Sequence, residues 1–283
     1  MNIHISPAIE PAWHKEYTFS KIGGYSCYGH PAIVRLLKQD FAALIIEKPP
    51  QEAVIKSRPN LIYKVPFPGG PAFPFPGVVV KKCVARNLLQ LFSSLFQKSK
   101  AQRSFIAAAE LIKARLDTPL PLAYMEKRTG GFVLVSYYIT EAVDDFMKVR
   151  TYLKTWPDAG EIHDMVRAVA EFSRRMHDAG MMHRDLNLTN FLLCGKDDTR
   201  RLTLVDLNRL RTRRRLSSFS RVLDIGRLYW DNYRPEFFRI YSGTDKNIQR
   251  WEWFFNFYYV WRRKRRAVKD WLGGKGRRKK VKG

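Results

Sequence analysis

The feature that most constrains the fold is a polar loop between a predicted helix and a predicted strand. Apolar residues recur every three or four positions from Glu161 to Asp178, which predicts a helix with one buried face, and Gly180 follows as a stop. The next loop reads His-Arg-Asp-Leu-Asn-Leu-Thr-Asn over residues 183–190. Residues 202–205 are typical of a short strand, and they lead directly into Asp206. Few folds require a helix, a polar loop, a strand and a carboxylate in this order.

The loop carries a pattern with a known chemistry. It matches H-R-D-L-x-x-x-N, which is typical of the catalytic loop of protein-kinase-like phosphotransferases. Phosphoryl transfer needs a carboxylate that orients the acceptor hydroxyl and ligands for the metal ion that neutralises the phosphates. We therefore predict that Asp185 is the catalytic carboxylate and that Asn190 and Asp206 are ligands of Mg²⁺. The alternative is an ordinary polar turn followed by a surface carboxylate.

Three short strands are predicted upstream of this helix. They cover residues 53–56, 61–65 and 78–84, and a turn at residues 57–60 joins the first two. A glycine-rich phosphate loop of the form G-x-G-x-x-G does not precede the third strand. We therefore expect nucleotide phosphates to be bound by backbone N–H groups of the turn and by Arg58.

The third strand contains the predicted nucleotide lysine. Val-Val-Val-Lys, ending at Lys81, is similar to the V-A-I-K pattern whose lysine contacts the α- and β-phosphates. Lys82 is the alternative, because successive side chains of a strand point to opposite faces. The helix predicted from Ala101 to Arg115 carries Glu110 far from its apolar face, so an ion pair of Glu110 with this lysine is not expected.

A buried strand is predicted for residues 132–139, followed by Thr140 and Glu141. In a kinase arrangement this segment is the hinge, whose backbone pairs with adenine. Glu141 is therefore a predicted nucleotide-binding residue. A plain core strand would have the same Val and Leu residues.

Further segments extend the match beyond the loop. They are Ser99–Phe105, Thr118–Leu122, Ile139–Glu141, Val205–Arg209 and Asp224–Tyr229. Together with the loop they resemble the lipopolysaccharide core kinases, the Kdo/WaaP group, over roughly two-thirds of the chain. The resemblance implies an ATP- and Mg²⁺-dependent kinase that phosphorylates a heptose or Kdo sugar of the lipopolysaccharide inner core. It also implies that Asp224 braces the catalytic loop.

The same resemblance implies an α+β, two-lobed protein-kinase-like fold. The N-lobe is expected to be a small antiparallel sheet with one helix, and the C-lobe to be larger and mainly helical. The expected division is an N-terminal extension at residues 1–52, the N-lobe at 53–140, the C-lobe at 141–272 and a disordered basic tail at 273–283.

The net charge narrows the class of partner. A formal charge of +25 over 283 residues predicts attraction to a polyanion. Arg209, Arg211 and Arg213 follow the metal-binding Asp206, on the acceptor side of a kinase site, and guanidinium groups suit an anionic lipopolysaccharide precursor. They are predicted acceptor-binding residues, with a solvated segment as the alternative.

Two other functions are compatible with the sequence. One is a kinase of a protein or another small molecule, and the other is a non-catalytic polyanion-binding protein. No motif for specific nucleic-acid recognition is present.

Two segments are typical of a membrane surface. Residues 87–97 predict an amphipathic helix with basic flanks, and the aromatic residues of 251–261 run into a basic stretch. Core packing is the alternative for the aromatic residues. The sequence shows no signal peptide, and Cys27, Cys83 and Cys194 suggest no disulfide framework. We therefore expect a cytoplasmic protein that is peripheral on the inner face of the inner membrane.

Overall fold

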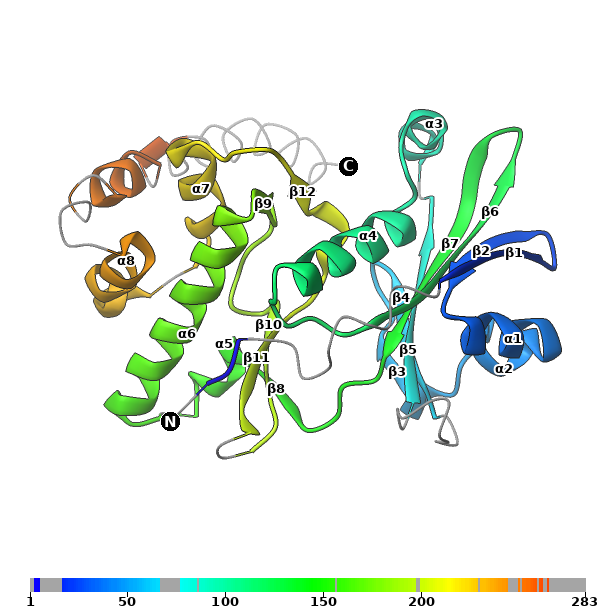
Figure 1. The fold of residues 1–283 in the computed structure, drawn as a ribbon, viewed down its shortest axis with the longest axis horizontal. Helices are drawn as coiled ribbons and strands as arrows, with labels where there is room; N and C mark the ends of the chain where they lie inside the picture. Colours follow the sequence, from blue (N-terminus) through cyan, green and yellow to red (C-terminus); the bar gives the residue numbers. More distant parts are fainter. Residues whose placement is uncertain are drawn as a thin grey trace, which may run out of the picture. The chain divides into compact units, whose positions relative to one another are not determined.

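The fold is described from a computed structural model (Figure 1). It describes residues 3–5, 17–66, 77–85, 87–155, 157–196, 199–228, 230–243, 249, 251–258, 260–261 and 264. The chain forms two compact units. We call Met1–Pro157 with Thr189–Arg211 the sheet unit, and Asp158–Leu188 with Thr212–Gly283 the helical unit. The tail predicted at residues 273–283 lies outside the described residues.

A seven-stranded antiparallel sheet forms the centre of the sheet unit. Its strand order is β1-β2-β6-β7-β5-β4-β3. The strands are β1 (Thr18–Ile22), β2 (Tyr25–Gly29), β3 (Val54–Lys56), β4 (Leu61–Pro66), β5 (Gly77–Val84), β6 (Pro121–Thr129) and β7 (Phe132–Glu141). The strands predicted from hydrophobic runs therefore form β3, β4, β5 and β7, and the predicted turn joins β3 to β4.

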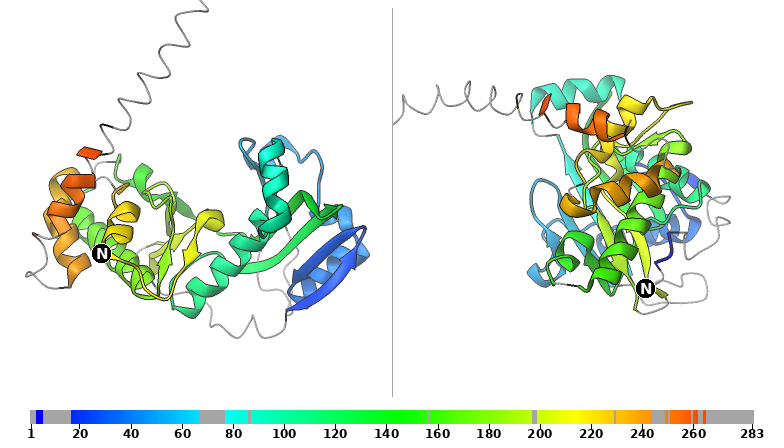
Figure 2. Two further views of the ribbon diagram at one scale, coloured as in Figure 1. Left: turned by 90° about the horizontal axis from the view of Figure 1, so that it is seen from above. Right: turned by 90° about the vertical axis from the view of Figure 1, so that its left-hand side faces the viewer.

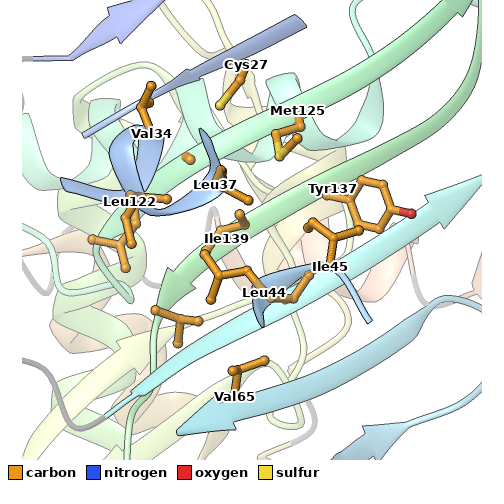
Figure 3. Close-up of a cluster of buried hydrophobic side chains, with 14 of the residues drawn as sticks. Cys27, Val34, Leu37, Leu44, Ile45, Val65, Leu122, Met125, Tyr137 and Ile139 are labelled. Carbon is orange, nitrogen blue, oxygen red and sulfur yellow. The ribbon is translucent and has the colours of Figure 1, made fainter. Parts of the chain in front are cut away.

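Helices cover both faces of the sheet (Figure 1). On one face lie α1 (Pro31–Gln39) and α2 (Phe41–Leu44), whose Leu37 and Leu44 are fully buried against the strands (Figure 3). On the other face lies α4 (Lys100–Lys113), whose Phe105 packs with Tyr138 of β7. A short helix η2 (Gln51–Ala53) precedes β3.

Two strands from the first 52 residues belong to this sheet. An N-terminal extension was expected at residues 1–52, before the segment that resembles the kinase family. In the structure β2 pairs with β6 from Ser26 to Gly29, and β1 pairs with β2. Gly29 is required at this pairing, since a Cβ there would lie 2.4 Å from the Cβ of Ala123. The boundary at residue 52 thus falls inside one hydrophobic core.

Two helices follow β5. The first is α3 (Leu88–Phe96), whose N-cap Asn87 accepts a hydrogen bond from the N–H of Gln90 at 2.9 Å. The second is α4, whose N-cap Ser99 accepts a hydrogen bond from the N–H of Gln102 at 3.0 Å. Both helices were predicted. The buried face of α4 includes Ala108 and Leu111, whereas Ala109 is half-buried.

The sheet unit also contains a smaller three-stranded sheet of order β11-β10-β8. Its strands are β8 (Phe146–Lys148), β10 (Phe191–Cys194) and β11 (Arg201–Leu204). The short helix α5 (Val149–Tyr152) follows β8, and η4 (Leu207–Arg209) and β12 (Arg211–Thr212) follow β11. The strand predicted at residues 202–205 therefore corresponds to β11, one residue earlier.

The helical unit is built on α6 (Ala159–Asp178). Its apolar face buries Met165, Val169 and Phe172, as the hydrophobic spacing predicted. Gly180, with φ +75°, ends the helix region. The remaining elements are β9 (Met181–Met182), α7 (Ser218–Ile225), η5 (Asp231–Tyr233), α8 (Arg234–Ser242) and a helical stretch at residues 251–258.

The aromatic segment at 251–261 has two kinds of residue. Phe255 and Tyr258 are buried, and Phe255 packs on Phe238 of α8 with ring centres 5.5 Å apart. Trp253 and Phe257 are exposed and stack on each other. Core packing, one of the two alternatives from the sequence, therefore holds for one face of this helix. The other alternative, contact of the aromatic residues with a membrane surface, stays a prediction. Among the described helices of the chain, none combines the length and apolar character needed to cross a bilayer.

Candidate functional site

Lys81 and Asp206 form an ion pair in the sheet unit. Lys81 extends from β5, and Asp206 follows β11, 125 positions later in the chain. The Nζ of Lys81 lies 2.5 Å from Oδ1 of Asp206, and the lysine side chain is nearly buried. Asn208 also donates a hydrogen bond to Oδ1 of Asp206, at 2.6 Å. The predicted nucleotide lysine and the predicted metal ligand therefore meet.

The strand register separates Lys81 from Lys82. Lys81 lies opposite Tyr138 of β7, and Tyr138 packs against α4. Lys82 lies opposite Tyr137 on the other face, with its Nζ 5.9 Å from the centre of the Tyr137 ring. Because directly paired residues share a face, only Lys81 reaches Asp206. Phosphate binding by Lys81 stays a prediction, although its position now favours it over Lys82.

Main-chain contacts position Asp206. The N–H of Leu204 donates to the carbonyl of Asp117, and the hydroxyl of Thr118 donates to the carbonyl of Leu204 at 2.8 Å. The N–H of Val205 donates to the carbonyl of Asn190 at 2.9 Å. Asp206 itself adopts a left-handed backbone conformation with φ 63°. These contacts hold the end of β11 beside Asn190. Val205, which precedes Asp206 and bonds to Asn190, connects the two predicted metal ligands.

The oxygen groups at this place suit Mg²⁺. Within the described part of the chain, no three His, Cys, Asp or Glu side chains gather as a metal cluster. Mg²⁺ is commonly held by one or two carboxylates together with substrate phosphates and water. Asp206, whose carboxylate is about one-third exposed, would supply one such ligand, and the side-chain oxygen of the half-buried Asn190 would supply another. The residues present therefore fit a Mg²⁺ ion that also binds phosphate.

Glu141 forms hydrogen bonds within the protein, to the main chain of Leu120. Its Oε1 accepts a hydrogen bond from the N–H of Leu120 at 3.0 Å, and its own N–H donates to the carbonyl of Leu120 at 3.1 Å. Burial raises the pKa of the Glu141 carboxyl, and the nearby Arg201 guanidinium offsets part of that shift. Contact of Glu141 with a nucleotide stays a prediction. Arg58, also predicted to bind nucleotide, is exposed in the turn between β3 and β4.

The sequence did not predict an acidic partner for Lys81 on α4. In the structure the acidic partner of Lys81 comes from another element. The side chain of Gln102, a possible substitute for a helix glutamate, donates to the hydroxyl of Tyr124 at 3.1 Å. Asp206 is the residue paired with Lys81. α4 still contributes indirectly, because it packs against η4, the turn that follows Asp206.

A buried carboxylate braces the catalytic loop in the helical unit. Asp224 of α7 accepts hydrogen bonds from the N–H groups of His183 and Arg184, each at 2.6 Å. Arg184 has φ 64°, an uncommon conformation for a residue with a side chain. The two bonds to one carboxylate hold the backbone in this conformation. The bracing role implied for Asp224 by the family resemblance is thus seen directly.

Asp224 is in turn fixed by a chain of buried polar groups. The Nε2 of His177 lies 3.2 Å from Oδ2 of Asp224, and its Nδ1 lies 2.6 Å from the hydroxyl of Tyr241. Burial raises the pKa of the Tyr241 hydroxyl, and the Arg221 guanidinium offsets part of this shift. The phenol therefore keeps its proton. Because an ionised carboxylate can only accept hydrogen bonds, Nε2 of His177 donates to Asp224.

Asp185 contacts an arginine that the sequence analysis did not select. Nη1 of Arg227 lies 2.5 Å from Oδ1 of Asp185, and both side chains are about one-third exposed. Arg227 follows Gly226, which is needed because a Cβ there would lie 2.2 Å from the ring of Tyr258. Tyr258 therefore packs closely against the residue that precedes Arg227. Asp185 keeps an accessible carboxylate with a fixed cationic neighbour.

The predicted acceptor arginines have side chains directed to solvent. Arg209 and Arg211, in the sheet unit, and Arg213, in the helical unit, are exposed. Their role in acceptor binding stays a prediction. Arg221 belongs to the same arginine-rich stretch and forms an ion pair within the protein. Its Nη1 lies 2.7 Å from Oδ1 of Asp178.

Sequence reasoning missed several residues that shape the site. Arg227, His177 and Tyr241 act through contacts between segments that are 40 or more positions apart. A single sequence contains no signal for such pairings. The motif Asp224-Ile-Gly-Arg227 was noticed as a family segment, and the charge of its arginine was the only pointer to a partner for Asp185.

The chain is similar in sequence to known kinases. The chain is 29% identical over 164 residues to the lipopolysaccharide core heptose(I) kinase WaaP of Escherichia coli, which covers 55% of this chain and 60% of that protein. It is 25% identical over 114 residues to the 3-deoxy-D-manno-octulosonic acid kinase of Vibrio cholerae, which covers 40% of this chain and 46% of that protein. The matches therefore span less than two thirds of these curated relatives.

A solved structure shows the same fold over a longer span. It is described as WaaP in complex with acyl carrier protein, and it matches with a TM-score of 0.57 and 23% identity over 82% of this chain and 96% of that chain. The predicted α+β, protein-kinase-like fold is confirmed. The sequence model of the lipopolysaccharide kinase (Kdo/WaaP) family matches residues 79–253, more than half of the sequence, and the chain therefore belongs to this family.

Proposed function

We propose that this protein is an ATP- and Mg²⁺-dependent kinase that phosphorylates a heptose or Kdo sugar of the lipopolysaccharide inner core. The observation that carries the proposal is the ion pair of Lys81 with Asp206 at 2.5 Å. It joins the predicted phosphate-binding lysine to the predicted metal ligand. Relatives whose names describe a heptose kinase and a 3-deoxy-D-manno-octulosonic acid kinase support the substrate class.

Each residue has a distinct task in this proposal. ATP with its bound Mg²⁺ supplies the phosphoryl group and neutralises its charge. Lys81 binds the nucleotide phosphates, and Asp206 and Asn190 hold the metal. Asp185 orients the sugar hydroxyl and accepts its proton, and Arg227 keeps the carboxylate of Asp185 in one orientation. Asp224 keeps the loop that carries Asp185 in its unusual backbone conformation.

The acceptor is proposed to be anionic. Arg209, Arg211 and Arg213 are exposed, and guanidinium groups bind carboxylate and phosphate through two parallel hydrogen bonds. Kdo carries a carboxylate, which fits this chemistry. A protein or another small molecule with a hydroxyl is the runner-up acceptor.

We further propose that the enzyme acts as a peripheral protein on the cytoplasmic face of the inner membrane. The net charge of +25 favours an anionic leaflet. The exposed Trp253 and Phe257 are residues that can insert among lipid headgroups. Most of the basic stretch that follows them lies outside the described residues.

The acceptor is best tested directly. The purified protein is incubated with γ-labelled ATP and Mg²⁺, together with dephosphorylated core oligosaccharide, a panel of proteins, or no acceptor. We expect label on the oligosaccharide alone, and loss of that label in Asp185→Asn. Label on proteins but not on the oligosaccharide would favour the runner-up, and no transfer to any acceptor would refute a kinase function.

A further inference from the structure

Most of the apolar face of helix α3 is exposed to solvent. Its five exposed apolar residues lie within about 120° of the helix circumference at 100° per residue, and they are Leu88, Leu89, Phe92, Leu95 and Phe96. Leu89 and Phe96 are 80% and 90% exposed. No residue of α3 is fully buried. An ordinary surface helix has the opposite arrangement, with its apolar side packed on the core.

α3 contacts the sheet through Phe92 and through polar groups. The Phe92 ring lies edge-on to the Phe132 ring of β7, with ring centres 5.6 Å apart. The hydroxyl of Ser94 accepts a hydrogen bond from the N–H of Val133 in β7 at 2.9 Å. The carbonyl of Ser94 accepts a hydrogen bond from Arg128 of β6 at 3.4 Å, and Arg128 also bonds to the carbonyl of Gly131 at 2.9 Å. These contacts hold the helix with Leu88, Leu89 and Phe96 outward. This orientation is built into the fold.

A cationic cavity lies directly beside this helix. It has a volume of about 170 Å³ and lies between α3, the end of β5, β7 and the start of α4. Lys98, Lys100 and Arg103 line it, together with the hydroxyl side chains of Ser93 and Ser99. The described residues that line it include no Asp or Glu. Such a lining suits a phosphate group, which accepts hydrogen bonds from ammonium, guanidinium and hydroxyl donors.

We infer that α3 and this cavity together form a docking site for an anionic phospholipid bilayer. The apolar ridge of α3 enters the interface between headgroups and acyl chains, and the cavity binds the phosphate of a lipid headgroup. The two features have the chemistry of adjacent layers of one membrane, because acyl chains are apolar and headgroup phosphates are anionic. Figure 1 shows α3 end-on beside β7, and the right-hand view of Figure 2 shows it lengthwise at the rim.

A bilayer fits these observations better than a protein partner does. The exposed residues of α3 form a ridge, and a ridge of Leu and Phe enters a fluid interface without a complementary pocket. The cationic residues favour an anionic surface. The inference deepens the proposed membrane location and rests on it, but it does not depend on which sugar is phosphorylated.

The apolar ridge is tested with exposed residues, whose replacement leaves the core intact. Phe96→Ser combined with Leu89→Ser is compared with Phe19→Ser, since Phe19 is an exposed phenylalanine on β1, away from α3. The readout is cosedimentation with vesicles of phosphatidylglycerol and phosphatidylcholine. We expect the α3 variant to bind at least about tenfold more weakly, and the Phe19 variant to bind like the wild type. Equal binding of both variants would overturn the inference.

The cavity is tested through its charge. Lys98→Gln is compared with Lys113→Gln, which removes an exposed lysine from the opposite end of α4. We expect only Lys98→Gln to weaken binding to phosphatidylglycerol vesicles. Glycerol phosphate in solution is a competitor that distinguishes a lipid headgroup from free phosphate: it should compete only weakly, because it lacks the acyl chains that the ridge contacts. Competition at equal phosphate concentration would reduce the site to a phosphate-binding pocket and overturn bilayer docking.

Insertion itself is observed with a fluorophore. Phe96→Cys offers an exposed thiol, whereas the three natural cysteines are buried. A polarity-sensitive dye at this position should shift to shorter wavelength with anionic vesicles and be quenched by brominated lipid. A shift with an acidic soluble protein but none with vesicles would show that α3 binds protein and would overturn the inference. Transfer to soluble core oligosaccharide, measured in parallel, should be the same in the α3 variants, so failure of docking and failure of the proposed reaction are distinguished.

Discussion

Asp224→Asn should loosen the catalytic loop. The side chain of Asp224 is fully buried and accepts two hydrogen bonds of 2.6 Å from the N–H groups of His183 and Arg184. An asparagine keeps one oxygen, but its NH₂ group faces a main-chain donor. The change removes one hydrogen bond to a charged group, about 1.5–3 kcal/mol, and leaves a buried donor unsatisfied, about 1–3 kcal/mol. We therefore expect a loss of about 3–5 kcal/mol in the free energy of unfolding of this region.

Two measurements locate the effect. Urea unfolding gives the change in stability, and native-state hydrogen exchange reports on the amides of His183 and Arg184. Both amides should lose protection in Asp224→Asn, while amides in the middle of α6 should change less. Transfer of phosphate to core oligosaccharide should fall as well, because the loop carries Asp185.

Asp178→Asn is the matched control. Asp178 ends α6 in the same unit, and its exposed carboxylate pairs with Arg221 at 2.7 Å. A surface ion pair of this kind contributes about 0.2–1 kcal/mol. If the two variants unfold at the same urea concentration and their His183 and Arg184 amides exchange equally, the bracing role of Asp224 is refuted.

Other contacts lead to further predictions. Lys81→Ala should lower kcat/KM for ATP about 10- to 100-fold and Lys82→Ala less than about threefold, because only the first loses charge-assisted contacts at the site; the reverse ranking would contradict the register. Glu141→Gln should be as stable as the wild type at low pH and more stable at neutral pH. Burial raises the folded-state pKa of Glu141, so wild-type stability falls as pH rises from about 4.3 through that pKa; parallel curves of Tm against pH would exclude this. Arg227→Ala should lower kcat about tenfold and leave the affinity for an ATP analogue unchanged, since Arg227 contacts Asp185; a change in nucleotide affinity alone would argue against this role.

The sequence predicted most elements that have a strong local pattern. The apolar spacing of α6 and the hydrophobic runs of β5 and β7 appear in the structure near the predicted bounds. The motif also brought Asp206 to the end of a strand, as expected. These features depend on residues close together in the chain, and local patterns record them.

Features that depend on pairing between distant segments could not be predicted from the sequence. The strand pattern alone could not choose between Lys81 and Lys82, because alternation shows that two faces exist without showing which one α4 covers. β1 and β2 contain no motif, and only their pairing with β6 assigns them to the sheet. The amphipathic period of α3 was visible in the sequence. Which of its side chains face outward depends on contacts of Ser94 and Phe92 with β7, and the sequence alone does not show these contacts.

The packing around Tyr241 limits how the chain can be shortened. Trp251 lies edge-on to the Tyr241 ring, with centres 5.2 Å apart, and Tyr258 covers Gly226. Tyr241 in turn holds His177, which contacts Asp224. A fragment that ends at the family segment Asp224–Tyr229, or just after α8, would retain every motif residue and still lack the residues that support them. The smallest active fragment should therefore extend past Tyr258, and an inactive shorter fragment would say nothing about the chemistry of Asp185.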